Sequence, residues 1–252
     1  MRTLGLVLSV SVVACASGPA PATNDPPPVS TSAPALDASA VAPAEVASAA
    51  PVASASASAA EAPPAKAPAE PLPAGLKVLV IGDSFAEALG VGLKAKEKDT
   101  GIKVTLRGEK ATFIPEWAGP NKGVAVLVKQ YQPDLVVIAL GGNELAMTTP
   151  EIRAPKVAKL VGLLGETPCV WVSPPLWGNK DNGLLGIIRD NSKPCRHFDS
   201  NVLAPDLPRG SDKIHPTAEG QKKWATHLLD WLAGERDTSA GKFTLRPRPA
   251  GE

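Results

Sequence analysis

The chain has 252 residues, which is enough for one or two domains, but its composition limits how much of that length can build a core. It contains 27 prolines, and Ala, Pro and Ser are concentrated in its first third. The formal net charge is +1, without a cluster of lysines and arginines. Because phosphate binding needs a clustered positive field, this charge pattern argues against a nucleic-acid partner.

The N-terminus has the pattern of an export signal. Arg2 precedes an apolar run over residues 4–13, which is too short for a membrane-spanning helix of about 20 residues. The run ends in Val12-Val13-Ala14-Cys15, which resembles the bacterial lipobox, in which the cysteine is acylated and becomes the new N-terminus. We therefore predict a lipoprotein signal peptide over residues 1–14 and a lipid anchor, of the palmitate type, on Cys15. An ordinary signal peptide cut nearby, leaving a spare thiol, is the alternative.

The three cysteines fit an exported protein if Cys15 carries lipid, because Cys169 and Cys195 then remain as an even pair. Both stand at the start of predicted consecutive strands, so a disulfide between them is geometrically reasonable. Such a bridge would stabilise the fold by roughly 3 kcal/mol on the loop-entropy estimate. Two separately buried thiols are the alternative.

A low-complexity segment rich in Ala, Pro and Ser precedes the part of the chain that can fold. It has no apolar periodicity and almost no large side chains, so it cannot bury enough surface to offset its ordering entropy. We predict a disordered linker over residues 15–75, a folded domain over residues 76–235 and a flexible tail over residues 236–252. The linker would hold the domain away from the membrane.

Strand-like and helix-like patterns alternate through the predicted domain. The expected strands are residues 77–81, 102–106, 134–140, 169–173 and 195–198. The expected helices are residues 85–98, 123–130, 151–164, 184–189 and 217–232. This alternation predicts an α/β fold, a three-layer α/β/α sandwich around a five-stranded parallel sheet. In such sheets functional side chains gather at the carboxyl ends of the strands.

Three polar clusters stand out, two directly after predicted strands and one in the final loop. They are Gly82-Asp83-Ser84-Phe85 after the first strand, Gly141-Gly142-Asn143-Glu144 after the third, and Asp212-Lys213-Ile214-His215 before the last helix. Each cluster alone is as typical of a turn or a helix cap as of a site. Their joint occurrence in this order favours a functional interpretation.

The residue types in these clusters point to nucleophilic catalysis. A serine hydroxyl is a weak nucleophile until a base takes its proton, and His215 can be the base for Ser84. Asp212 can accept the other ring N–H and fix the tautomer. The side-chain amide of Asn143 and the backbone N–H of Ser84, at a helix N-terminus, can stabilise an oxyanion.

These motifs resemble those of the SGNH/GDSL hydrolases, and the resemblance covers roughly residues 77–232. Gly82-Asp83-Ser84-Phe85 matches the family's first sequence block, with Phe85 where Leu is usual. Gly141-Gly142-Asn143-Glu144 matches its Gly-x-Asn-Asp block, with Glu144 where Asp is usual. The resemblance implies a flavodoxin-like sheet, a Ser84–His215–Asp212 triad, and hydrolysis of esters or thioesters with neither metal nor cofactor. It also implies an oxyanion donor from a glycine after the second strand, for which Gly108 is the candidate.

The family's second block, which corresponds to residues 107–112 after the second strand, departs from the family pattern. The family often has its glycine nearer the position of Thr112, where this chain has Lys110 and Ala111. Trp117 and Trp177 could stack on a sugar ring or an acyl chain, with core packing as the alternative. His197 and His227 are expected to have packing or surface roles.

We therefore expect a monomeric, membrane-anchored esterase of the bacterial cell envelope that hydrolyses short-chain or acetyl esters of small molecules or carbohydrates. Its membrane contact would be through the lipid alone. The departures from the family pattern leave open a non-catalytic envelope-binding protein on the same scaffold. The same triad also fits acyl transfer to an acceptor other than water.

Overall fold

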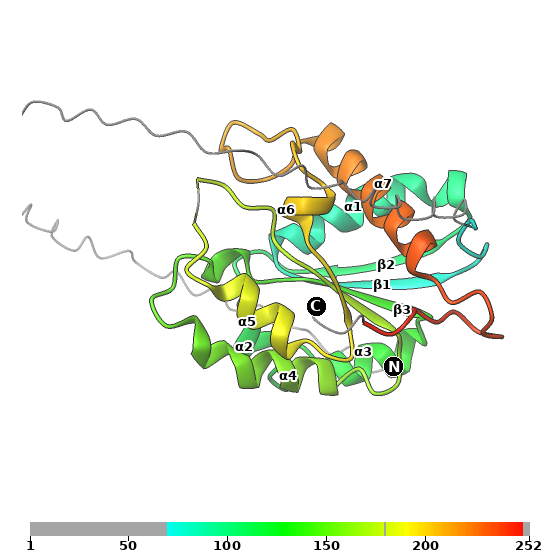
Figure 1. Ribbon diagram of the computed structural model, residues 1–252, viewed down its shortest axis with the longest axis horizontal. Coiled ribbons are helices and arrows are strands. Elements are labelled where there is room, and N and C mark those ends of the chain that lie inside the picture. The colour runs from blue at the N-terminus through cyan, green and yellow to red at the C-terminus, as the bar shows by residue number, and fades with distance from the viewer. Residues whose placement is uncertain (1–69, 179, 249–252) are drawn as a thin grey trace, which may run out of the picture. The chain divides into compact units, whose positions relative to one another are not determined.

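The computed structural model describes residues 70–178 and 180–248 (Figure 1). The predicted signal peptide, Cys15 and most of the predicted linker lie outside these residues. Within the described part of the chain, no helix is both long enough and apolar enough to cross a membrane.

Five strands form one parallel sheet. The strands are β1 (Lys77–Gly82), β2 (Lys103–Gly108), β3 (Leu135–Ala139), β4 (Cys169–Val172) and β5 (Arg196–Phe198). Their spatial order is β2-β1-β3-β4-β5, and all neighbouring pairs are parallel. This is the flavodoxin-like order, in which the chain reverses its direction of winding between β1 and β3. The predicted α/β class and flavodoxin-like parallel sheet are confirmed.

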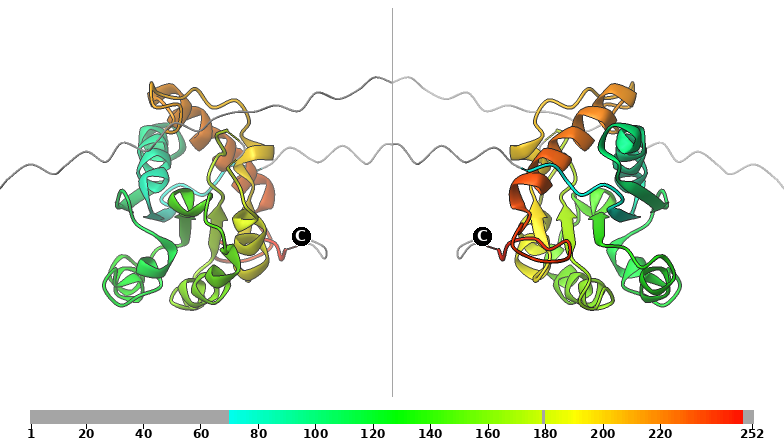
Figure 2. Two further views of the ribbon diagram at one scale, coloured as in Figure 1. Left: turned by 90° about the vertical axis from the view of Figure 1, so that its left-hand side faces the viewer. Right: turned by 90° about the vertical axis from the view of Figure 1, so that its right-hand side faces the viewer.

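Helices cover both faces of this sheet (Figures 1 and 2). One face is covered by α1 (Ser84–Thr100), α6 (Ser200–Leu203) and α7 (Ala218–Glu235). The other face is covered by α2 (Ile114–Trp117), α3 (Val124–Tyr131), α4 (Ala154–Gly162) and α5 (Leu184–Asn191). Two 3-10 turns, η1 (Gly142–Glu144) and η2 (Pro150–Arg153), follow β3.

The alternation of side chains along β1 divides the core into two layers. Val78 and Val80 belong to the apolar cluster that includes α1 and α7, whereas Leu79 and Ile81 belong to the cluster on the opposite face. Successive residues of a strand point to opposite faces, and here both faces are buried. This explains why β1 reads as a continuous apolar run.

The predicted helix over residues 151–164 is divided in the structure. Its first turn is η2, and α4 begins only at Ala154, with Pro155 in its first turn. The short helices α2 and α6 were not predicted, because elements of four residues carry no periodicity to detect.

Residues 236–248, part of the predicted flexible tail, contact the folded domain in the structure. Arg196, 5 % exposed, donates from Nη1 to the carbonyl oxygen of Arg246 at 2.8 Å. Arg248 donates from Nη2 to the carbonyl oxygen of Cys195 at 2.6 Å. Arg196 also forms an ion pair with Glu235 at 2.9 Å. The segment is held because its backbone satisfies a buried guanidinium group. Residues 249–252 of the predicted tail lie outside the described residues.

A disulfide joins Cys169 and Cys195, whose Cα atoms lie 4.7 Å apart. Cys169 begins β4, and Cys195 directly precedes β5. The bridge therefore attaches the three-residue edge strand β5 to the sheet, as the sequence predicted. The two cysteines are 26 residues apart in the chain, a separation for which a disulfide stabilises by about 3 kcal/mol.

Candidate active site

Ser84 lies at the turn between β1 and α1, as its first helical residue. The turn brings Gly82 very close to β3. Gly82 has φ +136°, and a Cβ atom there would lie 2.0 Å from the carbonyl oxygen of Ala139, so only glycine fits. The first N–H groups of a helix have no partner within it, so the N–H of Ser84 is available at the positive end of α1.

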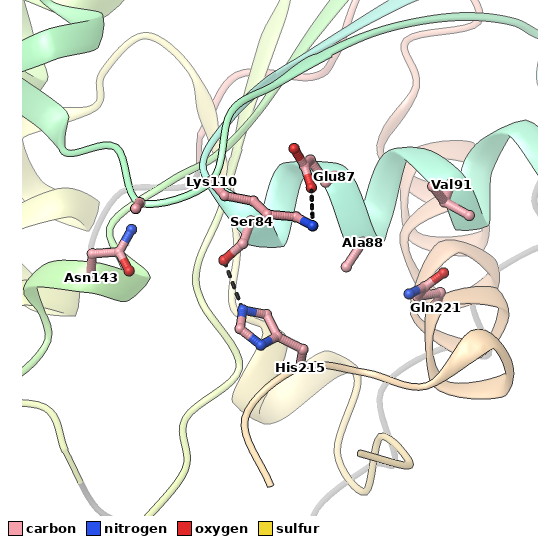
Figure 3. A pocket seen from close by; sticks show the side chains of 9 residues that line it. Ser84, Glu87, Ala88, Val91, Lys110, Asn143, His215 and Gln221 are labelled. Atoms are coloured by element: carbon pink, nitrogen blue, oxygen red, sulfur yellow. Dashed lines mark hydrogen bonds and ion pairs between the residues drawn. The ribbon is translucent and has the colours of Figure 1, made fainter. Parts of the chain in front are cut away.

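His215 and Asp212 complete a chain of hydrogen bonds that starts at Ser84 (Figure 3). The Oγ atom of Ser84 lies 2.8 Å from Nε2 of His215, and Nδ1 of His215 lies 2.7 Å from Oδ2 of Asp212. The other carboxylate oxygen of Asp212 accepts the backbone N–H groups of Ile214, at 2.9 Å, and His215, at 3.0 Å.

These hydrogen bonds determine the protonation of the aspartate. The His215 ring, followed by the two backbone N–H donors, lowers the pKa of Asp212 to about 2. An ionised Asp212 accepts from Nδ1 of His215, which leaves Nε2 as the acceptor for the Ser84 hydroxyl. The structure thus brings together the three residues predicted as a triad, in the order that nucleophilic catalysis needs.

Arg209 holds the loop that carries His215, and the sequence reasoning did not identify it. Its guanidinium group donates to the carbonyl oxygen of Ile214 within the loop. It also donates to the carbonyl oxygen of Leu176, at 2.8 Å, in the segment after β4. The N–H of Gly210 closes the loop by donating to the carbonyl oxygen of His215 at 2.9 Å. Arg209 is therefore a positioning residue, and no motif in the sequence signals it.

Asp83 is fully buried beside Ser84 and connects two turns. Its Oδ1 atom accepts the N–H of Phe85 at 2.8 Å, which caps α1. Its Oδ2 atom accepts the N–H groups of Gly141, at 3.1 Å, and Gly142, at 3.0 Å. Burial raises the pKa of Asp83 to about 6, against the lowering effect of the three N–H donors. The carboxylate thus fixes the cluster that contains Ser84 to the cluster that contains Asn143.

Asn143 lies in η1 and lines the same cavity as Ser84 (Figure 3). One N–H of its side-chain amide donates to the carbonyl oxygen of Thr112 at 2.9 Å. A primary amide has two N–H groups, so the second remains for a ligand. The bond to Thr112 sets the orientation in which the amide is presented.

Gly108 does not line the cavity. It ends β2, and a Cβ atom there would lie 2.8 Å from the backbone nitrogen of Glu87, so its lack of a side chain permits close packing against α1. Ala111 lines the cavity instead, with φ +56°, a left-handed conformation that glycine usually adopts. In the second block the cavity is therefore lined by Ala111, next to Thr112, and not by Gly108.

The cavity at Ser84 has a volume of about 500 Å³, within the usual range for ligand sites. Its lining residues come from α1, the loop after β2, η1, the loop that carries His215, and the first turn of α7. They are Ser84, Glu87, Ala88, Val91, Lys110, Ala111, Asn143, His215 and Gln221. Among the described residues, no group of three or more His, Cys, Asp or Glu side chains is placed to bind a metal ion.

Glu144 has a structural role. Its side chain is 2 % exposed, accepts the N–H of Ile114 at 2.9 Å, and is paired with Arg153. These contacts connect η1 to α2 and to the η2–α4 segment.

The two tryptophans considered as ligand platforms lie outside the cavity lining. Trp117 is 3 % exposed and donates from Nε1 to Thr112 Oγ1 at 2.9 Å. Trp177 packs against both core clusters, with its ring 5.7 Å from that of Phe85.

Burial lowers the pKa of His197, on β5, to about 4, so its ring is neutral. His227 lies within α7.

Several solved structures are similar to this chain. A lipase/acylhydrolase from Enterococcus faecalis matches with a TM-score of 0.50 and 16 % identity, over 69 % of this chain and 99 % of that chain. LAE5, an alpha/beta hydrolase enzyme from the metagenome of Lake Arreo, matches with a TM-score of 0.49 and 19 % identity, over 65 % and 96 %. A member of the lipolytic protein G-D-S-L family from Veillonella parvula matches with a TM-score of 0.44 and 12 % identity, over 61 % and 96 %.

No protein-family model and no curated protein sequence matches the chain. The likeness to the Enterococcus faecalis structure shows the fold. The chain therefore has the SGNH-hydrolase fold, a parallel five-stranded sheet between two layers of helices.

Replacing Asp83 by Asn should destabilise the protein by about 2–3 kcal/mol. Asparagine has one acceptor oxygen, and its NH₂ group would face the backbone N–H donors of either Phe85 or the two glycines. Urea unfolding measures the effect, with the exposed Asp190→Asn variant as the matched control. Equal unfolding free energies for the two variants would contradict the structural role of Asp83.

Proposed function

We propose that the protein is a serine ester hydrolase in which Ser84, His215 and Asp212 act as a triad. The observation that carries this proposal is the continuous chain of hydrogen bonds at 2.8 and 2.7 Å from the Ser84 hydroxyl to the Asp212 carboxylate. The position of Ser84 at a helix N-terminus, within a cavity that also contains Asn143, gives further support. The SGNH-hydrolase fold is consistent with such a site.

The proposed reaction has two stages. In the first, Ser84 Oγ attacks the carbonyl carbon of the ester while its proton passes to Nε2 of His215. The tetrahedral intermediate collapses when the bond to the alcohol oxygen breaks and His215 returns the proton to that oxygen. In the second stage water, deprotonated by His215, attacks the acyl-enzyme, and Ser84 is released with its proton restored.

The oxyanion of each intermediate would lie among three donors. They are the N–H of Ser84, the free amide N–H of Asn143, and the backbone N–H of Ala111, which replaces Gly108 in our proposal. Fixed donors of this kind stabilise the developing negative charge without reorganisation, and each contributes about 10²–10³-fold in rate. A left-handed backbone at Ala111, within the cavity, supports its choice over Gly108.

We further propose that the acyl group is short, such as acetyl, and that the substrate is a small-molecule or carbohydrate ester of the cell envelope. A complete set of nucleophile, base and orienting carboxylate favours catalysis over the alternative of a non-catalytic binding protein. Water is the proposed acceptor, and products formed in the presence of a candidate carbohydrate would reveal acyl transfer.

Replacing Ser84 by Ala should reduce hydrolysis of p-nitrophenyl acetate to the uncatalysed rate and abolish labelling by a fluorophosphonate probe, since only an activated serine reacts with it. The variant should unfold at the wild-type temperature. Ser239→Ala, at an exposed serine near the C-terminus, is the matched control and should retain both activities. Unchanged turnover in Ser84→Ala would rule out the triad, and a wild-type protein that neither labels nor turns over would favour the binding alternative.

We also propose that Cys15 carries the lipid that anchors the protein in the bacterial cell envelope. The lipobox-like residues and the disulfide, which is typical of exported proteins, support this. Metabolic labelling with an alkyne analogue of palmitate should mark the wild-type protein in the membrane fraction. The Cys15→Ser variant should lose the label, whereas equal labelling of both would show that the lipid, if any, lies elsewhere.

A further inference from the structure

A groove leads away from Ser84 along one face of α1. Glu87, Ala88 and Val91 lie three, four and seven residues after Ser84, which places all four on the same side of the helix, and all four line the cavity. At 1.5 Å per residue, the floor from Ser84 to Val91 is about 10 Å long. Figure 3 shows Ser84, Glu87, Ala88 and Val91 one after another along α1.

The wall of the groove beside His215 comes from the C-terminal part of the domain. His215 and Gln221 line the cavity from the loop before α7 and from its first turn. At the far end, α1 and α7 touch. A Cβ atom on Gly92 would lie 2.1 Å from the carbonyl oxygen of Gln221, so the backbones meet there without a side chain between them. The groove therefore ends near Val91.

The position of the base determines which half of the ester enters this groove. The leaving alcohol oxygen must receive a proton from Nε2 of His215, whereas the carbonyl oxygen must face Asn143, on the other side of Ser84 (Figure 3). The alcohol half therefore lies on the side of His215, and the wall of the groove continues from His215 to Gln221.

The polar groups of the groove suit a hydroxylated ligand. Glu87 and Lys110 form an ion pair at 3.6 Å on one side of the floor. Gln221 donates from Nε2 to the carbonyl oxygen of Pro216 at 3.1 Å, which fixes its amide and leaves its carbonyl oxygen as an acceptor. Ala88 and Val91 supply an aliphatic strip between these groups. Among the described residues, no Phe, Tyr or Trp side chain lines the cavity.

We propose that the groove between α1 and α7 is the alcohol subsite, and that it selects esters of polyhydroxylated alcohols, such as acetylated sugars, over esters of simple aliphatic alcohols. The inference rests on the proposed hydrolase function and adds the identity of the leaving group. Hydroxyl groups would bind to Glu87, Lys110 and Gln221, and the C–H face of the alcohol would lie on Ala88 and Val91.

Two substrate series separate the alcohol subsite from an acyl subsite. In the first, the acyl group is always acetyl and the alcohol is methanol, hexanol or a monosaccharide. In the second, the alcohol is always p-nitrophenol and the acyl chain grows from acetyl to octanoyl. Val91→Trp narrows the groove at a side chain that is 50 % exposed, and Val126→Trp, on α3 and 66 % exposed, is the matched control.

Val91→Trp should lower kcat/KM for the acetylated sugar relative to methyl acetate by about tenfold or more, because a filled pocket excludes the larger group. The ratios within the acyl series should not change, and Val126→Trp should alter neither series. A Val91→Trp effect confined to the acyl series would overturn the assignment, because the groove would then hold the acyl chain. Wild-type ratios in both series would also overturn it.

A second variant tests the preference for hydroxyl groups. Gln221→Leu removes the acceptor while keeping a similar volume, so kcat/KM for the acetylated sugar should fall about fivefold relative to hexyl acetate. An unchanged ratio would overturn the selection of hydroxylated alcohols. A wild-type protein that hydrolyses no ester and does not react with a fluorophosphonate would instead overturn the proposed function, and this inference with it.

Discussion

The buried carboxylate of Asp83 is the constraint on which the rest of the site depends. It accepts one N–H from the start of α1 and two from the turn after β3, so a single side chain sets the distance between the segments that carry Ser84 and Asn143. A buried charge is costly unless it is fully hydrogen-bonded, and here three backbone donors provide that compensation. The glycines at positions 82 and 142 allow the turns to approach closely enough for these bonds.

The histidine reaches the serine by a separate route. Ser84 and His215 are 131 residues apart in the chain, yet their side chains meet because α1 and α7 pack side by side on the same face of the sheet. The loop before α7 is closed by its own hydrogen bonds and attached by Arg209 to the segment after β4. The position of His215 is thus set by helix packing and one guanidinium group, independently of the Asp83 network.

This division has a consequence for the proposed chemistry. The nucleophile and the oxyanion donors belong to the first half of the domain, whereas the base and one wall of the groove belong to its end. The proposed alcohol subsite lies between the two, along the helix that Ser84 begins. Changes at Val91 or Gln221 can therefore alter the choice of alcohol without moving the nucleophile, whereas changes at Asp83 or Arg209 would affect the geometry of the reaction itself.

The sequence by itself determined the features that depend on local patterns. Alternating strand-like and helix-like segments defined the α/β class. Polar clusters after two strands marked Ser84 and Asn143, because parallel strands bring their carboxyl ends to one edge, and a third cluster before the last helix marked Asp212 and His215. The catalytic roles of these residues remain predictions. Only the tertiary structure decided that Ala111 faces the cavity in place of Gly108, and that Arg246 and Pro247 accept hydrogen bonds from Arg196. Loop conformations and contacts between distant segments leave no periodic signal in a sequence, so packing alone settles them.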